Sequence, residues 1–159
     1  MHLVSFIGLL LLPAPALASR IGRDVVPKCD YKAKGNLPEL QYEALVGFAD
    51  LLIVKRDVLA AFNRYIPGEY KQHNPFAEQG RDFAIQVLSN GFAEGNMPGN
   101  LTVFGGQGYG MMHYRVDVPL TGKAFAIADY FKFRGGCIVE HWDVLQEITG
   151  NEPNPIAYF

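Results

Sequence analysis

The hydrophobic pattern of the chain changes its period near residue 101, and this change constrains the fold more than any other feature. Before that point apolar residues recur at helical spacing, and after it they alternate as they do in strands. The helical segments are residues 38–55, 57–65 and 81–92, and the alternating segments are residues 101–104, 110–119, 123–133 and 137–148. Gly-rich or Thr-Gly turns join the strands as antiparallel neighbours, so the sequence predicts one α+β domain.

The N-terminal end has the pattern of a secretory signal peptide. Residues 1–18 contain no Asp, Glu, Lys or Arg, run through an apolar stretch at 3–12 and end on Ala-Leu-Ala. A membrane span needs roughly 20 apolar residues, and two prolines interrupt this segment. We therefore predict cleavage after Ala18, an irregular arm over 19–36, one domain over 37–159, and a secreted protein. An uncleaved anchor is the alternative.

The charge balance excludes one class of partner. The chain has 14 Lys and Arg residues against 16 Asp and Glu residues, which gives a formal net charge of −2. The basic residues form no cluster, whereas nucleic-acid binding needs a positive patch. We expect no nucleic-acid partner.

Two features suit a chain that is modified outside the cell. Cys29 and Cys137 follow the predicted leader and are candidates for a disulfide between the arm and the last hairpin, although the sequence does not show that they meet. They lack the spacing of a redox or metal motif. Asn100 begins an Asn-Leu-Thr sequon and is a candidate glycosylation site in a eukaryotic host.

An acidic residue interrupts the apolar face of the segment at 123–133. Alternation places Asp129 on one face with Phe125, Ile127, Phe131 and Phe133. Apolar surroundings disfavour the charged form of a carboxyl group, which makes Asp129 a candidate general acid or base. The alternative is a position at the rim of the sheet, where Asp129 pairs with a lysine or caps a turn.

The turn after this strand decides which residue lies opposite Asp129. A two-residue turn at 135–136 would place Trp142 there, whereas a three-residue turn at 134–136 would place His141 there. A slip of one residue exchanges the two faces of a strand.

We favour the three-residue turn, because it brings His141 and Asp143 to the face of Asp129 as one polar cluster. Trp142 then covers the outer face, where it could form a dimer contact.

Two other histidines are candidates to relay protons to Asp129. Histidine titrates near neutral pH and offers one donor and one acceptor. His73 could instead order its loop, and His113 could be a satisfied sheet residue. Alternation does not decide whether His113 lies on the inner or the outer face of its strand, because it shares a face with Arg115 while Tyr114 lies in the more apolar set. No His or Cys pair has ligand spacing, so we expect no metal site.

Several motifs follow one another in a characteristic order. They are Gln72-His73-Asn74-Pro75, Gly80, His113, and residues 129–146 with Glu140-His141-Trp142-Asp143-Val144. In this order and spacing, over about residues 40–159, the chain resembles the SnoaL-like polyketide cyclases of the nuclear transport factor 2-like (NTF2-like) superfamily.

The resemblance implies a cone of three N-terminal helices over a curved, mostly antiparallel sheet with an apolar pocket. Members of the superfamily catalyse aldol cyclisation, ketosteroid isomerisation or dehydration without a cofactor, and others only bind ligands or partners. Asp129 matches the acid that moves a proton in the cyclases. Asn74 stands where the isomerases have a general-base Asp, a departure that argues against steroid isomerisation.

We therefore expect a secreted SnoaL-like protein, more an enzyme than a binding module, that acts without a cofactor on a small apolar carbonyl metabolite. The predicted catalytic residues are Asp129, His113 and His73, and the predicted binding residues are Asn74, His141, Trp142 and Asp143. The alternative is a non-catalytic ligand-binding or dimerisation module with the same pocket. The resemblance also makes a homodimer an expectation.

Overall fold

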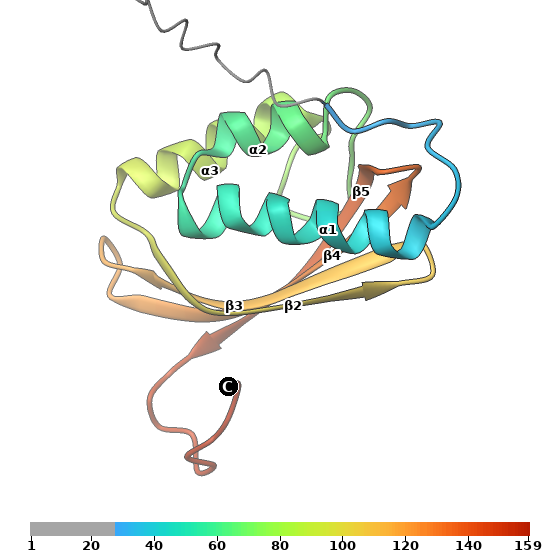
Figure 1. The fold of residues 1–159 in the computed structure, drawn as a ribbon. Coiled ribbons are helices and arrows are strands. Elements are labelled where there is room, and N and C mark those ends of the chain that lie inside the picture. The colour runs from blue at the N-terminus through green and yellow to red at the C-terminus, as the bar shows by residue number, and fades with distance from the viewer. Residues whose placement is uncertain (1–27) are drawn as a thin grey trace, which may run out of the picture.

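The computed structural model describes residues 28–159. The predicted signal peptide at 1–18 and residues 19–27 of the predicted arm lie outside the described residues. The elements, in chain order, are α1 (Leu37–Ala49), the π-helix η1 (Asp50–Val54), α2 (Val58–Tyr65), β1 (Lys71–Gln72), α3 (Arg81–Ala93), β2 (Met97–Gly106), β3 (Tyr109–Val118), β4 (Lys123–Arg134) and β5 (Cys137–Ile148). Figure 1 shows the helices on one side of the sheet and the C-terminal tail leaving β5 on the other.

The helices form where the periodicity predicts them. The first predicted segment forms α1 and then continues as the π-helix η1. Asp57 caps α2, because its side chain accepts a hydrogen bond from the amide of Ala60 at 2.9 Å. A cap of this kind stabilises a helix by about 1 kcal/mol. The third segment forms α3, with its boundary within one residue of the prediction.

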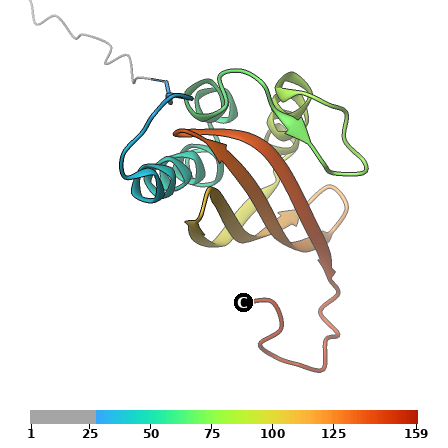
Figure 2. The ribbon, with the colours of Figure 1, turned by 90° about the vertical axis from the view of Figure 1, so that its right-hand side faces the viewer.

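The sheet has the strand order β1-β5-β4-β3-β2. The four long strands form an antiparallel meander, and Figure 2 shows how they twist beneath the helices. The loop predicted before α3 contains a short strand instead, because β1 pairs in parallel with β5 at Glu140 and His141. Two residues are too few to show a period, so the sequence pattern could not predict this strand.

The hairpin between β4 and β5 has a register that the sequence analysis did not foresee. Arg134 pairs with Cys137 across two glycines, so the predicted three-residue turn is wrong. A bulge follows in β5, where Val139 is the extra residue, and it shifts the pairing by one position. Asp129 therefore lies opposite Asp143, and neither predicted partner stands there.

The faces of the hairpin are nevertheless those that the three-residue turn implied. One extra residue in β5 exchanges its inward-facing and outward-facing positions, as one extra residue in the turn would. His141 and Asp143 therefore share the helix-facing side with Asp129, and Trp142 lies on the outer side opposite Tyr130.

The described part of the arm is attached to this hairpin. Cys29 and Cys137 form a disulfide with a Cα–Cα distance of 5.2 Å. Next to it, the amide of Gly136 donates to the carbonyl oxygen of Asp30 at 2.9 Å. Gly135 has a φ of 58°, and a Cβ there would collide with the backbone of Asp30. The pairing that the sequence left open is thus formed, and it is consistent with an extracellular protein.

An aromatic core lies between the helices and the sheet. Phe48 of α1 packs against Phe62 of α2 and Phe131 of β4, with ring centroids 5.8 and 5.5 Å apart. All three side chains are fully buried. This cluster holds the helix layer over β4 and forms one wall of the cavity described below.

The candidate glycosylation site is accessible. Asn100 is exposed in β2, at a point where the register with β3 shifts, and has a φ of 53°. Glycosylation there stays a prediction.

None of the helices within residues 28–159 has the length and apolar character needed to cross a membrane.

Removal of the disulfide should destabilise the fold. The bond joins residues separated by 108 positions, and closing a loop of that size stabilises a protein by about 4 to 5 kcal/mol in the chain-entropy model. We expect Cys29→Ser/Cys137→Ala to lower the free energy of urea unfolding by that order. A loss below about 1 kcal/mol would contradict a structural role for the bond.

Candidate functional site

A cavity of ≈240 Å³ lies between the helices and the face of the sheet that carries Asp129. Its walls are mainly Phe, Leu and Val side chains of the helices and strands. Its polar groups come from β1 and the residues around it, and from β3, β4 and β5. They are Tyr70, Gln72, Asn74, Tyr114, Asp129, His141 and Asp143. An apolar pocket with a few convergent polar groups is typical of a small-molecule site.

Asp129 is buried at the centre of these polar groups, with 7% of its surface exposed. Its Oδ2 accepts a hydrogen bond from the Tyr114 hydroxyl at 2.8 Å, and its Oδ1 lies 3.2 Å from Nε2 of His141. Asp129 is therefore not at a rim, and it pairs with no lysine among residues 28–159, so that alternative is wrong.

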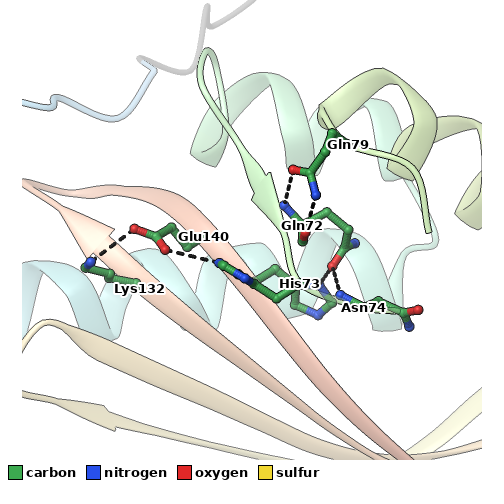
Figure 3. A network of polar contacts seen from close by, with 7 residues as sticks. Gln72, His73, Asn74, Gln79, Lys132 and Glu140 are labelled. Atoms are coloured by element: carbon green, nitrogen blue, oxygen red, sulfur yellow. Dashed lines mark hydrogen bonds and ion pairs between the residues drawn. The ribbon is translucent and has the colours of Figure 1, made fainter. Parts of the chain in front are cut away.

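The position of one proton on His141 follows from its neighbours. Nδ1 lies 2.9 Å from Oε1 of Gln72, and the same oxygen accepts the backbone N–H of Asn74 at 3.1 Å. A backbone N–H can only donate, so this atom of Gln72 is an acceptor and Nδ1 must carry a hydrogen. The backbone N–H of Gln72 donates to Oε1 of Gln79 at 3.1 Å, and this contact holds the segment of β1 in place (Figure 3).

With Nδ1 protonated, the contact between His141 and Asp129 requires one further proton. It lies either on Nε2, as an imidazolium beside a carboxylate, or on Oδ1, as a carboxylic acid beside a neutral imidazole. Without that proton, two lone pairs would face each other at 3.2 Å. We conclude from this geometry that the pair shares one proton.

A second carboxyl group lies directly across the hairpin. Asp143 pairs with Asp129 in the β4–β5 register, and its Oδ2 accepts a hydrogen bond from Nδ2 of Asn74 at 2.7 Å. Asp143 is partly exposed, whereas Asp129 is buried. The two carboxyl groups thus have different surroundings, an arrangement that can separate the acid from the base in a reaction.

The same residues form the cluster that could bind a cation. One donor atom from each of Asp129, His141 and Asp143 lies within 4.8 Å of the others. A metal ion would need Nε2 of His141 and would compete there with the shared proton. The expectation of no metal site therefore stays a prediction.

Two tyrosines of the site were missed by the sequence analysis. Burial raises the pKa of Tyr114 well above its usual value, and the charge of Asp129 adds to this effect. Burial likewise raises the pKa of Tyr70, with further contributions from Asp129 and Asp143. Both phenols remain protonated donors at ordinary pH. The sequence analysis placed Tyr114 among the apolar residues of its strand. The signal that it belongs to the site is the pairing of β3 with β4, which brings its hydroxyl near Asp129.

His113 does not lie in this site. It is on the outer face of β3, because its neighbours Met112 and Tyr114 point inward and strand side chains alternate. Its ring stacks on Phe159 with centroids 4.9 Å apart. The predicted relay from His113 to Asp129 is wrong.

His73 and Trp142 also lie on the outer face. The His73 ring stacks on Trp142 at 4.3 Å, and Nε2 lies 3.2 Å from Glu140, which also accepts a hydrogen bond from Lys132 (Figure 3). His73 follows Gln72 in the extended segment, so it points away from the cavity when Gln72 points in. The catalytic role predicted for His73 and the binding role predicted for Trp142 are therefore wrong. The histidine that contacts Asp129 is His141.

Comparison with known proteins identifies the fold. No protein-family model matches the chain, and no curated protein matches it. AclR from Streptomyces galilaeus, provisionally assigned as a hydroxylase, has a TM-score of 0.54 at 13% identity over 67% of this chain and 88% of that one. An NTF2-like protein of unknown function from Cytophaga hutchinsonii has a TM-score of 0.51 at 14% identity over 65% and 88%.

A protein from Mesorhizobium loti, provisionally assigned as a SnoaL-like polyketide cyclase, has a TM-score of 0.50 at 14% identity over 64% of this chain and 96% of that one. The predicted α+β fold of the NTF2-like proteins and SnoaL-like cyclases is confirmed. At these identities the likeness concerns the fold, and the chemistry must be argued from the residues.

Replacement of Gln72 should release the fixed imidazole. In Gln72→Leu, the Nδ1–H of His141 loses its acceptor, so we expect the free energy of unfolding to fall by about 1 to 3 kcal/mol. The ¹⁵N resonances of the imidazole should show a protonated Nδ1 in the wild type and a mixture of tautomers in the variant. Gln79→Leu is the control, because it removes support of the loop and leaves this acceptor. An unprotonated Nδ1 in the wild type would contradict the assignment.

Alkaline pH should destabilise the protein through its buried tyrosines. An unfolded tyrosine ionises near pH 10, whereas Tyr114 keeps its proton to higher pH when folded. Unfolding then releases a proton, and its free energy falls by up to about 1.4 kcal/mol per pH unit and tyrosine above pH 10. Tyr114→Phe should reduce this slope by about one proton in urea titrations. Equal slopes for both proteins would show that Tyr114 is not protected.

Proposed function

We propose that this chain is a secreted acid–base catalyst that acts without a cofactor on a small apolar compound with a carbonyl group. The observation that carries the proposal is the buried contact between Asp129 and His141 inside an apolar cavity. We infer from its geometry that the pair shares one proton. Such a pair can donate a proton to a bound substrate and take it back.

The two carboxyl groups divide the chemistry. Asp143, as a carboxylate oriented by Asn74, removes a proton from the carbon next to the substrate carbonyl. The electron pair of the broken C–H bond moves to the carbonyl oxygen, and the proton of the Asp129–His141 pair passes to that oxygen to give an enol. Tyr114 donates to Asp129 throughout and stabilises the carboxylate that remains.

The enol can then react in three ways. Return of the proton to another carbon is an isomerisation, attack of the enol carbon on a second carbonyl is a cyclisation, and loss of a neighbouring hydroxyl group as water is a dehydration. The aromatic and aliphatic walls limit water near the pair and strengthen its electrostatic interactions. The amide of Asn74 cannot act as a base, so the part that we assign to it is to orient Asp143.

The location and partners belong to the same proposal. The disulfide and the leader-like pattern of residues 1–18 support a protein of the extracellular space. A small apolar metabolite suits the cavity, and the sparse basic charge argues against nucleic acid. A homodimer remains an expectation.

One observation favours a second function, that of a ligand-binding module. Both oxygens of Asp129 already have partners, Tyr114 and His141, without any substrate. A carboxyl group satisfied in this way could orient a ligand and never transfer a proton. The two functions make different predictions for turnover.

Asp129→Asn should abolish most catalysis while the fold persists. We expect turnover to fall by about 10²- to 10⁴-fold, because the variant loses the shared acidic proton. Purified wild type and variant are incubated with small-molecule extracts of the source organism, and bound and free compounds are compared by mass spectrometry. A compound transformed by the wild type and only captured by the variant supports catalysis. A compound bound unchanged by both supports the binding module.

Two outer-face histidines provide matched controls for this experiment. His113→Gln and His73→Gln should keep near wild-type turnover, whereas His141→Gln should lose it. The same assay after treatment with a chelator tests the cation cluster, and we expect no change. Loss of activity in His113→Gln, or on chelation, would contradict the assigned roles.

A further inference from the structure

Tyr70 lines the cavity, and the proposed proton transfer gives it no part. The residue lies between α2 and β1 and is buried, with 7% of its surface exposed. Its ring is held from two sides, because it meets the ring of Phe62 edge to face at 5.8 Å and lies nearly parallel to the ring of His141 at 6.2 Å between centroids. The position of its hydroxyl group is therefore fixed relative to His141.

The hydroxyl group of Tyr70 can be reached from the cavity. The side-chain atoms within residues 28–159 that are sealed from solvent without a hydrogen-bond partner belong to Tyr31, Arg81 and Asn96. The oxygen of Tyr70 is not among them, and no regular hydrogen bond within this part of the chain occupies it. It therefore keeps surface that a small molecule can contact, and this surface faces the cavity that the residue lines.

His141 separates this hydroxyl group from the transferable proton. Nδ1 of His141 faces Oε1 of Gln72 at 2.9 Å, whereas Nε2 faces Oδ1 of Asp129 at 3.2 Å. The two nitrogens of an imidazole point away from each other, so Gln72 and Asp129 lie at opposite edges of the ring. The side chain of Gln72 also acts on Tyr70 as a hydrogen-bond donor and thereby lowers its pKa. The cavity thus offers two hydrogen-bonding positions, one at each edge of the imidazole.

The position at Tyr70 favours a neutral acceptor. Burial raises the pKa of Tyr70 well above its usual value, and the charges of Asp129 and Asp143 outweigh the opposing effect of Gln72, so the phenol keeps its hydrogen and donates it. The lining contributed by residues 28–159 contains these two carboxyl groups and no lysine or arginine. An anionic group of a ligand would lose its hydration there and be repelled by the carboxyl groups.

We propose that the substrate carries two neutral oxygen groups: an enolisable ketone at Asp129 and His141, and a second carbonyl group whose oxygen accepts a hydrogen bond from Tyr70. This inference rests on the proposed function for the reacting ketone, and it adds a substrate class and a specificity-determining residue. Tyr70 selects such compounds over those that carry carbon or a carboxylate in place of the second carbonyl group.

The test uses three ketones that differ in one group: 6-acetyl-1-tetralone, 6-isopropenyl-1-tetralone and 6-carboxy-1-tetralone. The isopropenyl group has the shape of the acetyl group without its acceptor, and the carboxyl group is ionised at neutral pH. By titration calorimetry, we expect the wild type to bind the acetyl compound about 5- to 10-fold more tightly than the isopropenyl compound. The carboxylate should bind more weakly than either. Equal affinities for the first two, tighter binding of the carboxylate, or no binding of the acetyl compound would overturn the inference.

Two tyrosine variants separate a ligand contact from a structural role. In Tyr70→Phe the acetyl and isopropenyl compounds should bind equally within about twofold, because the donor is gone. Tyr65→Phe is the matched control, since Tyr65 is buried to the same extent and does not line this cavity, and it should keep the wild-type preference. A structural role would weaken both compounds alike, so an unchanged preference in Tyr70→Phe would overturn the inference.

A measurement on the wild type needs no variant to fold. A hydrogen bond to a carbonyl oxygen weakens the C=O bond, so the infrared stretch of a ¹³C-labelled acetyl group should move to lower wavenumber when the acetyl compound binds. A stretch that stays at its position in an apolar solvent would show that the second carbonyl group has no donor and would overturn the inference.

Failure of this inference can be distinguished from failure of the proposed function. The hydrogens on the carbon next to the ring ketone exchange with deuterium when the tetralone enolises, and proton NMR in heavy water follows this exchange. If the wild type catalyses exchange that Asp129→Asn loses, but the acetyl preference does not depend on Tyr70, the catalytic proposal stands and the second contact is wrong. If the preference depends on Tyr70 and neither protein catalyses exchange, the second contact stands and the catalytic proposal is wrong.

Discussion

The extra residue in β5 is the constraint on which the site depends. Val139 has no partner in β4, and the bulge that it forms reverses the direction in which every later side chain of the strand points. With the bulge, a histidine and an aspartate enter the cavity and a tryptophan stays outside. Without it, the tryptophan would fill the space in front of Asp129, and no polar cluster would form.

A second constraint acts from the edge of the sheet. The two residues of β1 pair in parallel with β5, beside the histidine of the site. This pairing brings Gln72 into contact with His141, and the next inward residue, Asn74, into contact with Asp143. The residues that bear the proton lie on the long strands, and the short edge strand determines their orientation. Supporting contacts of this kind hold reactive groups in position.

Much of the fold could be read from the sequence, and the site only in part. The periods of the helices and long strands, the cap at Asp57 and the apolar surroundings of Asp129 are local properties, so local patterns reveal them. The pairing partner of Asp129 depends on one bulge, and no composition rule marks Val139 as its residue. The same limit misplaced His113 and His73, because alternation separates two faces but does not say which face is inside. Tyr114 was missed because its ring suits an apolar face and only pairing brings its hydroxyl to an acid.

The stack of His73 on Trp142 gives the protein an internal reporter. Trp142 is the single tryptophan of the chain, and it lies on β5 next to His141 but on the side away from the cavity. Its fluorescence therefore responds to the contact between β1 and β5, because the imidazole of His73 stacks on the indole. Ligands in the cavity reach it only through the backbone of β5. A change in tryptophan emission on ligand binding would thus measure how far the strand itself moves.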